Sequence, residues 1–204
     1  MADDAQALRG EWRRDYEPWR AEFDAFFEQQ DSTDVRILSW GPGEHTAYYE
    51  KRRSICADLA SRVRNSVFTS EQLFDSEPRF SELQDILLAQ EIQADEADIV
   101  ICLVVDDPVV SGAPAEILEF RRHPRIAPKI RLLLPMEARQ IGQGLLYQGC
   151  MQFPSNQSFR YTTKQYKQCD AIRAKCRQWV EAVRKEKHLE QWREGRLGLS
   201  GTTA

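Results

Sequence analysis

The feature of this sequence that most constrains its fold is an apolar run that leads into two aspartates and a loop of small residues. Residues 99–120 read IVICLVVDDPVVSGAPAEILEF. The apolar stretch Ile99–Val105 is typical of a strand that is covered on both faces of a parallel sheet. In an open α/β sheet, the loop between such a strand and the next helix is where ligands bind. The run therefore predicts both a class of fold and the position of a site.

Strand-like and helix-like segments alternate along most of the chain. Short β-like runs predict five strands, at Val35–Trp40, Ser66–Thr69, Ile99–Val105, Lys129–Leu134 and Cys150–Phe153. Helix-like patterns predict helices at Tyr48–Arg64, Phe80–Glu96, Pro114–Arg122, Glu137–Leu146 and Thr163–Trp192. This alternation favours a parallel sheet with right-handed crossovers and helices on both faces. For a chain of this length, the simplest strand order is 2-1-3-4-5.

The two ends of the chain differ from this α/β pattern. The segment 1–33 reads as a helical extension, because aromatic residues such as Trp12, Tyr16 and Trp19 recur at spacings of three and four. This aromatic stripe fits either packing on the protein's own surface or contact with a partner. The α/β domain is predicted to span residues 34–194, including a long C-terminal helix, and residues 195–204 read as a flexible tail.

Composition and charge exclude several classes of protein. The formal net charge of −4 argues against direct nucleic-acid binding. The five cysteines form no CxxC pair, and His45, His123 and His188 lie far apart, so no metal site is expected. No stretch approaches the roughly 20 apolar residues that cross a membrane, and the N-terminal sequence lacks the apolar core of a signal peptide. We therefore expect a cytoplasmic protein without a cofactor.

In the predicted strand order, the direction of the order reverses between strands 1 and 3. The loops after these two strands meet at this switch point and are expected to form the ligand-binding site. After strand 3, Gly112 lies among small residues that let a ligand approach the backbone, and Glu116 lies in the first turn of the next helix. The Glu116 carboxylate either stabilises positive charge on a substrate or only complements the helix dipole. Asp106 and Asp107 are adjacent, so in an extended chain they point to opposite sides. One could reach a ribose hydroxyl, while the other caps a helix end or faces solvent.

The loop after strand 1 supplies the other predicted binding residues. They are Trp40, Gly41, Gly43, Tyr48, Tyr49 and Arg52. The glycines suit a tight turn over a ligand, either tyrosine could stack on a base, and the arginine could meet a phosphate. The tryptophan also reads as a core residue, and the cations around the arginine also read as a solvated helix face. The loop lacks the GK[ST] of a P-loop and the spacing of GxGxxG.

The sequence resembles a known superfamily in several segments, namely WGPG, YYEKR, VFTSEQLF, LQDILLAQEIQADEADIV, SGAPAEILEF and PRIAPKIRLLLP. It is similar to the nucleoside 2-deoxyribosyltransferase-like proteins and to their bacterial TIR-like glycohydrolase relatives, which are linked to antiphage defence. The likeness spans roughly residues 34–185. Its best part is the small-residue loop with Glu116, which looks like the family's glycine-containing loop and catalytic glutamate. The family's preceding aspartate has Asp107 as its nearest counterpart, at a longer spacing.

This resemblance implies a flavodoxin-like sheet and cleavage of the base–ribose bond of NAD or of a related nucleotide or nucleoside. Glu116 would be the nucleophile or would stabilise the ribosyl cation, as a carboxylate beside an oxocarbenium-like carbon does. NAD would be a substrate rather than a cofactor, and the chain a defence or toxin effector. Such an enzyme needs control, so we expect self-association or a regulatory protein partner through the N- or C-terminal helices. The alternative is a non-enzymatic nucleotide-binding sensor or adaptor that uses the same crevice.

Overall fold

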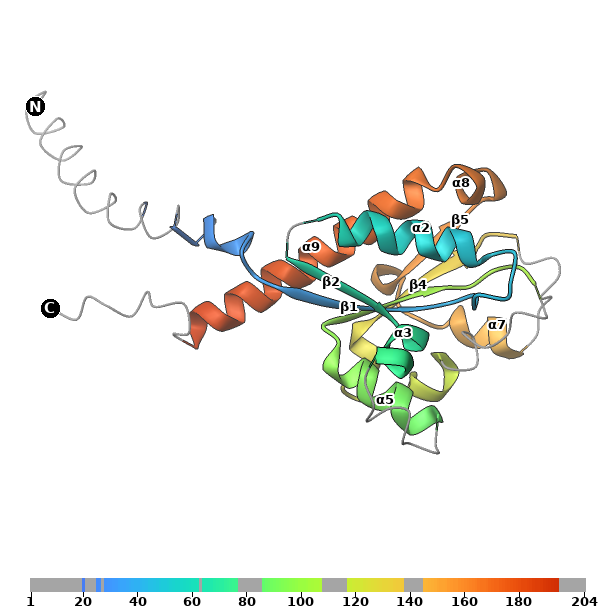
Figure 1. The fold of residues 1–204 in the computed structure, drawn as a ribbon, viewed down its shortest axis with the longest axis horizontal. Coiled ribbons are helices and arrows are strands. Elements are labelled where there is room, and N and C mark those ends of the chain that lie inside the picture. The colour runs from blue at the N-terminus through green and yellow to red at the C-terminus, as the bar shows by residue number, and fades with distance from the viewer. Residues whose placement is uncertain are drawn as a thin grey trace, which may run out of the picture. The chain divides into compact units, whose positions relative to one another are not determined.

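The computed structural model describes residues 20, 25–26, 28–62, 64–76, 86–107, 117–137 and 145–194. Its strands are β1 (Val35–Trp40), β2 (Asn65–Thr69), β3 (Ile99–Leu103), β4 (Ile130–Pro135) and β5 (Ser158–Tyr161). Its helices are α2 (Tyr49–Ala60), α3 (Ser70–Ser76), α5 (Ile86–Glu96), α7 (Leu145–Cys150), α8 (Thr163–Gln168) and α9 (Asp170–Arg193) (Figure 1). Two short 3-10 turns, η1 (Ala127–Lys129) and η2 (Ser155–Gln157), precede β4 and β5.

The strands form one sheet in the order β2-β1-β3-β4-β5, and every neighbouring pair is parallel. In the register, Leu38 of β1 lies between Phe68 of β2 and Val100 of β3. The predicted flavodoxin-like α/β fold with strand order 2-1-3-4-5 is therefore confirmed. The order reverses between β1 and β3, and this switch point is where such sheets bind ligands.

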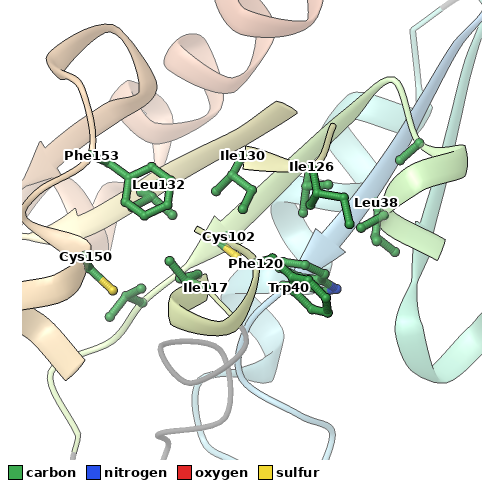
Figure 2. Close-up of a cluster of buried hydrophobic side chains, with 14 of the residues drawn as sticks. Leu38, Trp40, Cys102, Ile117, Phe120, Ile126, Ile130, Leu132, Cys150 and Phe153 are labelled. Atoms are coloured by element: carbon green, nitrogen blue, oxygen red, sulfur yellow. The ribbon is translucent and has the colours of Figure 1, made fainter. Parts of the chain in front are cut away.

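Two apolar clusters cover the two faces of this sheet. Alternate residues of β1, β3 and β4 pack on one side against α3, α5 and the segment that holds Ile117 and Phe120 (Figure 2). The remaining strand residues pack on the other side against α2 and the first half of α9. Strand β3 is buried along its whole length, which explains why its sequence is apolar at every position.

The fifth strand is β5 and not Cys150–Phe153, so that prediction was wrong. Cys150 ends α7, and Phe153 lies in the turn after it; both are apolar because they pack into the core cluster of Figure 2. The true strand, SFRY, lies at the edge of the sheet and is only partly buried. An edge strand needs no continuous apolar run, so its sequence gives a weak signal.

The predicted helix Thr163–Trp192 is two helices. Cys169 adopts a left-handed conformation (φ 66°) and ends α8 before α9 begins at Asp170. The N-terminus of α8 is held by a capping box, in which Thr162 and Gln165 exchange side-chain and backbone hydrogen bonds. Helix α3, which is short and polar, was not predicted.

The chain divides into two compact units, residues 34–183 and residues 1–33 with 184–204. In the second of these, the fully buried His188 ring lies 3.2 Å from the Thr33 hydroxyl and 2.8 Å from the Phe26 carbonyl oxygen. Arg184 donates to the Thr33 carbonyl. Much of the predicted N-terminal helix lies outside the described residues, as do most of Glu137–Leu146 and residues 195–204. Among the helices that are described, none combines the length and apolar character that a membrane span requires.

Candidate functional site

A cavity of about 210 Å³ lies at the carboxyl ends of β3, β4 and β5. Its lining residues are Tyr48, Val105, Asp106, Pro135, Glu137, Tyr161, Thr163 and Tyr166. They come from the loop before α2, from the ends of three strands and from α8. Parallel strands end at the same edge of a sheet, so residues far apart in the chain meet there.

Tyrosine rings form much of the cavity wall. The rings of Tyr161 and Tyr166 stack with their centroids 5.4 Å apart, and the Tyr161 hydroxyl donates to the carbonyl of Val104. Lys51 lies 5.8 Å from the centroid of the Tyr166 ring and donates to the Lys167 carbonyl at 2.7 Å. These contacts fix both rings before any ligand arrives.

The Tyr166 hydroxyl is buried and has no hydrogen-bond partner among the described residues. Burial raises its pKa well above the usual value for tyrosine, with a smaller contribution from Tyr48, so it stays protonated near neutral pH. A buried hydroxyl without a partner is uncommon, because leaving it unpaired is unfavourable. The Tyr166 hydroxyl, on a residue that lines the cavity, is therefore a donor and acceptor that the described residues leave unsatisfied.

The charged groups of the cavity are acidic. Asp106 and Glu137 line it, and its described lining residues include no lysine or arginine. Tyr48 is hydrogen-bonded to Asp107; burial and this bond both raise the pKa of the tyrosine. The arrangement suits hydroxyl groups, which donate to carboxylates, or a cationic ring, which is attracted to carboxylates and to tyrosine faces.

The structure brings three of the predicted residues together. Tyr48 and Asp106 line the cavity, and Asp107 is bonded to Tyr48. Tyr49 instead donates to Glu44 at 3.1 Å on the surface. The predicted residues Gly112 and Glu116 lie outside the described residues.

Trp40 was predicted to bind substrate, but its side chain is a core residue. It is 1% exposed and stacks on Phe120 with the ring centroids 5.5 Å apart (Figure 2). It belongs to the cluster on the α3 and α5 face, whereas Tyr48 and Tyr161 belong to the cluster on the opposite face. The physical reason is the alternation of strand side chains, which sends the last residue of β1 to that face.

Arg52 was predicted to meet a phosphate, but it is 2% exposed and bound within the protein. Its two terminal nitrogens each lie 2.8 Å from an oxygen of Glu71, and they also donate to the carbonyls of Ser39 (2.6 Å) and Pro42 (3.2 Å). The guanidinium therefore joins the loop after β1 to α3 and is not available to a ligand.

The glycines of the same loop have different surroundings. Gly41 has a φ of +154°, and a side chain there would meet the Leu103 carbonyl oxygen at 3.2 Å. The loop therefore crosses the end of β3 closely, as a glycine permits. A side chain at Gly43 would have only Glu71 nearby, at 3.9 Å.

Sequence reasoning missed six of the eight residues that line the cavity, namely Val105, Pro135, Glu137, Tyr161, Thr163 and Tyr166. Two of them follow from the misplaced fifth strand, because Tyr161 ends β5 and Thr163 begins α8 directly after it. The capping-box pattern Thr162–Gln165 was the available signal, since it marks a new helix start and hence a strand end before it.

No three histidine, cysteine, aspartate or glutamate side chains gather into a possible metal site within the described part of the chain. No known family model matches the sequence, and no curated protein matches it either. Among solved structures, the apo form of an NADH:FMN oxidoreductase is similar at 14% identity, over 74% of this chain and 88% of that chain, with a TM-score of 0.40. A likeness this low carries no argument about activity.

Proposed function

We propose that the chain is an enzyme that cleaves the bond between base and ribose in NAD or in a related nucleotide or nucleoside, with Glu116 as the catalytic carboxylate. The observation that carries the proposal is the tyrosine-lined cavity at the carboxyl ends of the strands, with the unpartnered Tyr166 hydroxyl and the Asp106 carboxylate. At about 210 Å³ the cavity is smaller than a typical whole-ligand pocket, so it would hold one moiety of a dinucleotide.

The chemistry of the cavity favours the base–ribose end of a substrate over its phosphates. Tyr48, Tyr161 and Tyr166 offer aromatic faces to a planar base, and the carboxylates of Asp106 and Glu137 attract a cationic ring or accept from ribose hydroxyls. The nicotinamide ring of NAD is such a cation. Phosphates would be repelled by the two carboxylates, so they would lie outside the cavity.

Glu116 belongs to the same β3–helix connection as Asp106. Ile117, the residue that follows it, lies in the same apolar cluster as Trp40, at the end of β1. In the proposed reaction the glycosidic C–N bond breaks and its electron pair goes to the base nitrogen, which neutralises a cationic base. Glu116 stabilises the oxocarbenium-like carbon. A water oxygen then bonds to that carbon and releases a proton.

Base release by the purified full chain tests the proposal. NAD, nicotinamide riboside and 2′-deoxyadenosine are incubated separately with the protein, and free base is measured by chromatography. We expect release from at least one substrate, and a rate at least about 100-fold lower for Glu116→Gln, since that change removes the charge that stabilises the transition state. Glu119→Gln is the matched control, because Glu119 is an exposed glutamate only three residues further along the chain.

A second variant tests the cavity itself. Tyr166→Phe removes only the unpartnered hydroxyl and is expected to raise KM several-fold, by roughly the value of one hydrogen bond. In cells, expression of the wild type should lower the NAD level and Glu116→Gln should not, as expected of a toxin or defence effector. Equal base release by wild type and Glu116→Gln would contradict the assignment of Glu116. Nucleotide binding without any base release would instead support the sensor alternative.

A further inference from the structure

We propose that a second groove, at the opposite end of the sheet from the tyrosine-lined cavity, binds a small molecule that carries phosphate groups. The groove has a volume of about 630 Å³, and its lining includes Arg121, Arg131, Gln152, Phe153, Asn156 and Gln157. Turns η1 and η2, which contribute to it, directly precede β4 and β5, so it lies at the amino ends of these strands.

The groove is separate from the candidate catalytic cavity. Strand β4 has six residues, and at about 3.3 Å per residue its two ends lie roughly 20 Å apart. The cavity lies beyond the carboxyl end of this strand and the groove lies beside its amino end. A ligand in the groove would therefore be distinct from a substrate in the cavity, and the present proposal does not depend on the proposed function.

The charge of the groove is opposite to that of the cavity. Two guanidinium groups and three carboxamides line it, and its described lining residues include no carboxylate. This concentration of positive charge occurs in a chain whose formal net charge is −4. Arginine matches phosphate oxygens with parallel N–H groups, which makes a phosphate-bearing ligand the complement of this lining.

Hydrogen bonds orient the groups of the groove. Arg121 donates to the Gln152 side chain at 2.6 Å, so its partner is a neutral amide and its charge remains. Arg131 donates to the carbonyls of Pro128 (2.6 Å) and Ile130 (3.0 Å). Both guanidinium groups therefore have preferred positions, which lowers the entropy lost when a ligand binds.

The walls of the groove are tied to each other and to α9. The Gln157 amide donates to the carbonyls of Ala127 and Pro128, each at 3.0 Å, and so joins η2 to η1. The indole N–H of Trp179 on α9 donates to the Asn156 carbonyl at 3.1 Å. Hydrogen bonds between three elements thus fix the walls of the groove relative to one another.

The size of the groove indicates more than a lone ion. A volume of about 630 Å³ is within the range of sites for small organic molecules. Two arginines offer charge to more than one phosphate oxygen, and the carboxamides offer donors and acceptors to the rest of the molecule. We therefore assign the groove to a small molecule that carries more than one phosphate oxygen, for which an unphosphorylated dicarboxylate is a poor substitute.

Inorganic pyrophosphate is the probe for this assignment, because the acidic cavity should repel it. Calorimetric titration of the full chain at low salt is expected to show one binding event that weakens as salt is raised. Arg121→Gln should weaken binding at least about tenfold, the value of one charge-assisted hydrogen bond. The double variant Arg121→Gln/Arg131→Gln should abolish measurable binding.

Two further variants keep the test decisive. Arg122→Gln makes the same charge change at an exposed neighbour that does not line the groove, and should keep the affinity within about twofold. Gln152→Glu keeps an acceptor for Arg121 and adds a negative charge to the groove, so it should weaken pyrophosphate binding. This variant keeps the test informative if the double variant Arg121→Gln/Arg131→Gln does not fold. Absence of pyrophosphate binding, equal loss in Arg122→Gln, or equally tight binding of malonate would overturn the proposal.

Discussion

The side chain of Arg52 connects three parts of the chain, namely β1, the loop after it and α3. It is almost fully buried, and its two terminal nitrogens together make four hydrogen bonds, two of them to Glu71. A guanidinium with this set of partners holds structure and is costly to replace, because lysine cannot reproduce its planar fork. Arg52 thus helps to position the β1–α2 loop, which leads to the cavity residue Tyr48.

Arg52→Lys is expected to lower the free energy of unfolding by about 1–3 kcal/mol, since several buried acceptors lose their donor. Urea unfolding followed by tryptophan fluorescence measures the change. Arg53→Lys is the control, because Arg53 is exposed and its ion pair with Glu50 lies at the surface; this variant should change the free energy of unfolding by less than about 0.5 kcal/mol. Equal losses in the two variants would contradict a structural role for Arg52.

The contribution of the Arg52–Glu71 ion pair to stability depends on pH, because the Glu71 carboxyl can be protonated. Burial alone would raise the pKa of the Glu71 carboxyl, but hydrogen bonds from Arg52 and the charge of Arg52 outweigh burial and hold it below its usual 4.5. Because the folded-state pKa is the lower one, the stabilisation is present above about pH 4.5 and is lost as the pH falls through the folded-state pKa.

Glu71→Gln should therefore be less stable than the wild type at pH 7, and the difference should shrink below pH 4.5. Urea unfolding at a series of pH values measures it. The same comparison with Glu50→Gln, whose ion pair with Arg53 is exposed, should give a small difference at every pH. If the difference in the free energy of unfolding between wild type and Glu71→Gln is the same at every pH, the charge of the Glu71 carboxylate does not stabilise its interaction with Arg52.

At the level of elements, the sequence predicts the strands that are buried on both faces. It misses the edge strand and the helix ends, whose positions depend on backbone pairing and capping rather than on burial. Strands β1, β3 and β4 are apolar because clusters cover both of their faces, so their positions follow from composition. Strand β5 is an edge strand, the start of α8 is set by a capping box, and the break at Cys169 is set by a left-handed backbone conformation; none of these leaves an apolar period in the sequence. Two cavity tyrosines were missed for the same reason, whereas Tyr48 and Asp106, in the connections after β1 and β3, were found.

The loop after β1 offers two glycines for comparison, one that is both strained and crowded and one that is neither. Gly41→Ala places a side chain 3.2 Å from the Leu103 carbonyl at a φ of +154°, and is expected to destabilise the protein by about 1–3 kcal/mol. Gly43→Ala, which meets only Glu71 at 3.9 Å, should change stability by less than about 1 kcal/mol. Thermal unfolding of both variants checks the prediction, which fails if Gly43→Ala is as damaging as Gly41→Ala.

Across the whole molecule, the two compact units are stabilised by different contacts. The unit of residues 34–183 has the sheet and its two apolar clusters. In the other unit, the described contacts centre on His188, which is bonded to Thr33 and Phe26 and packs on the Phe26 ring at 4.3 Å. Because these described contacts are hydrogen bonds and a ring contact rather than an apolar cluster, this unit should open more readily than the sheet does.

His188→Ala tests this difference in local stability. The change removes both hydrogen bonds and the ring contact with Phe26, so amide hydrogen exchange of residues 28–33 should accelerate at least about tenfold. Amides of β1, β3 and β4 should keep their rates, because none of the lost contacts involves these strands. Mass spectrometry of deuterium uptake measures both regions, with the exposed Glu186→Ala as control. Equal acceleration in the three strands would mean that the units open together, and that His188 stabilises the whole molecule rather than its own unit.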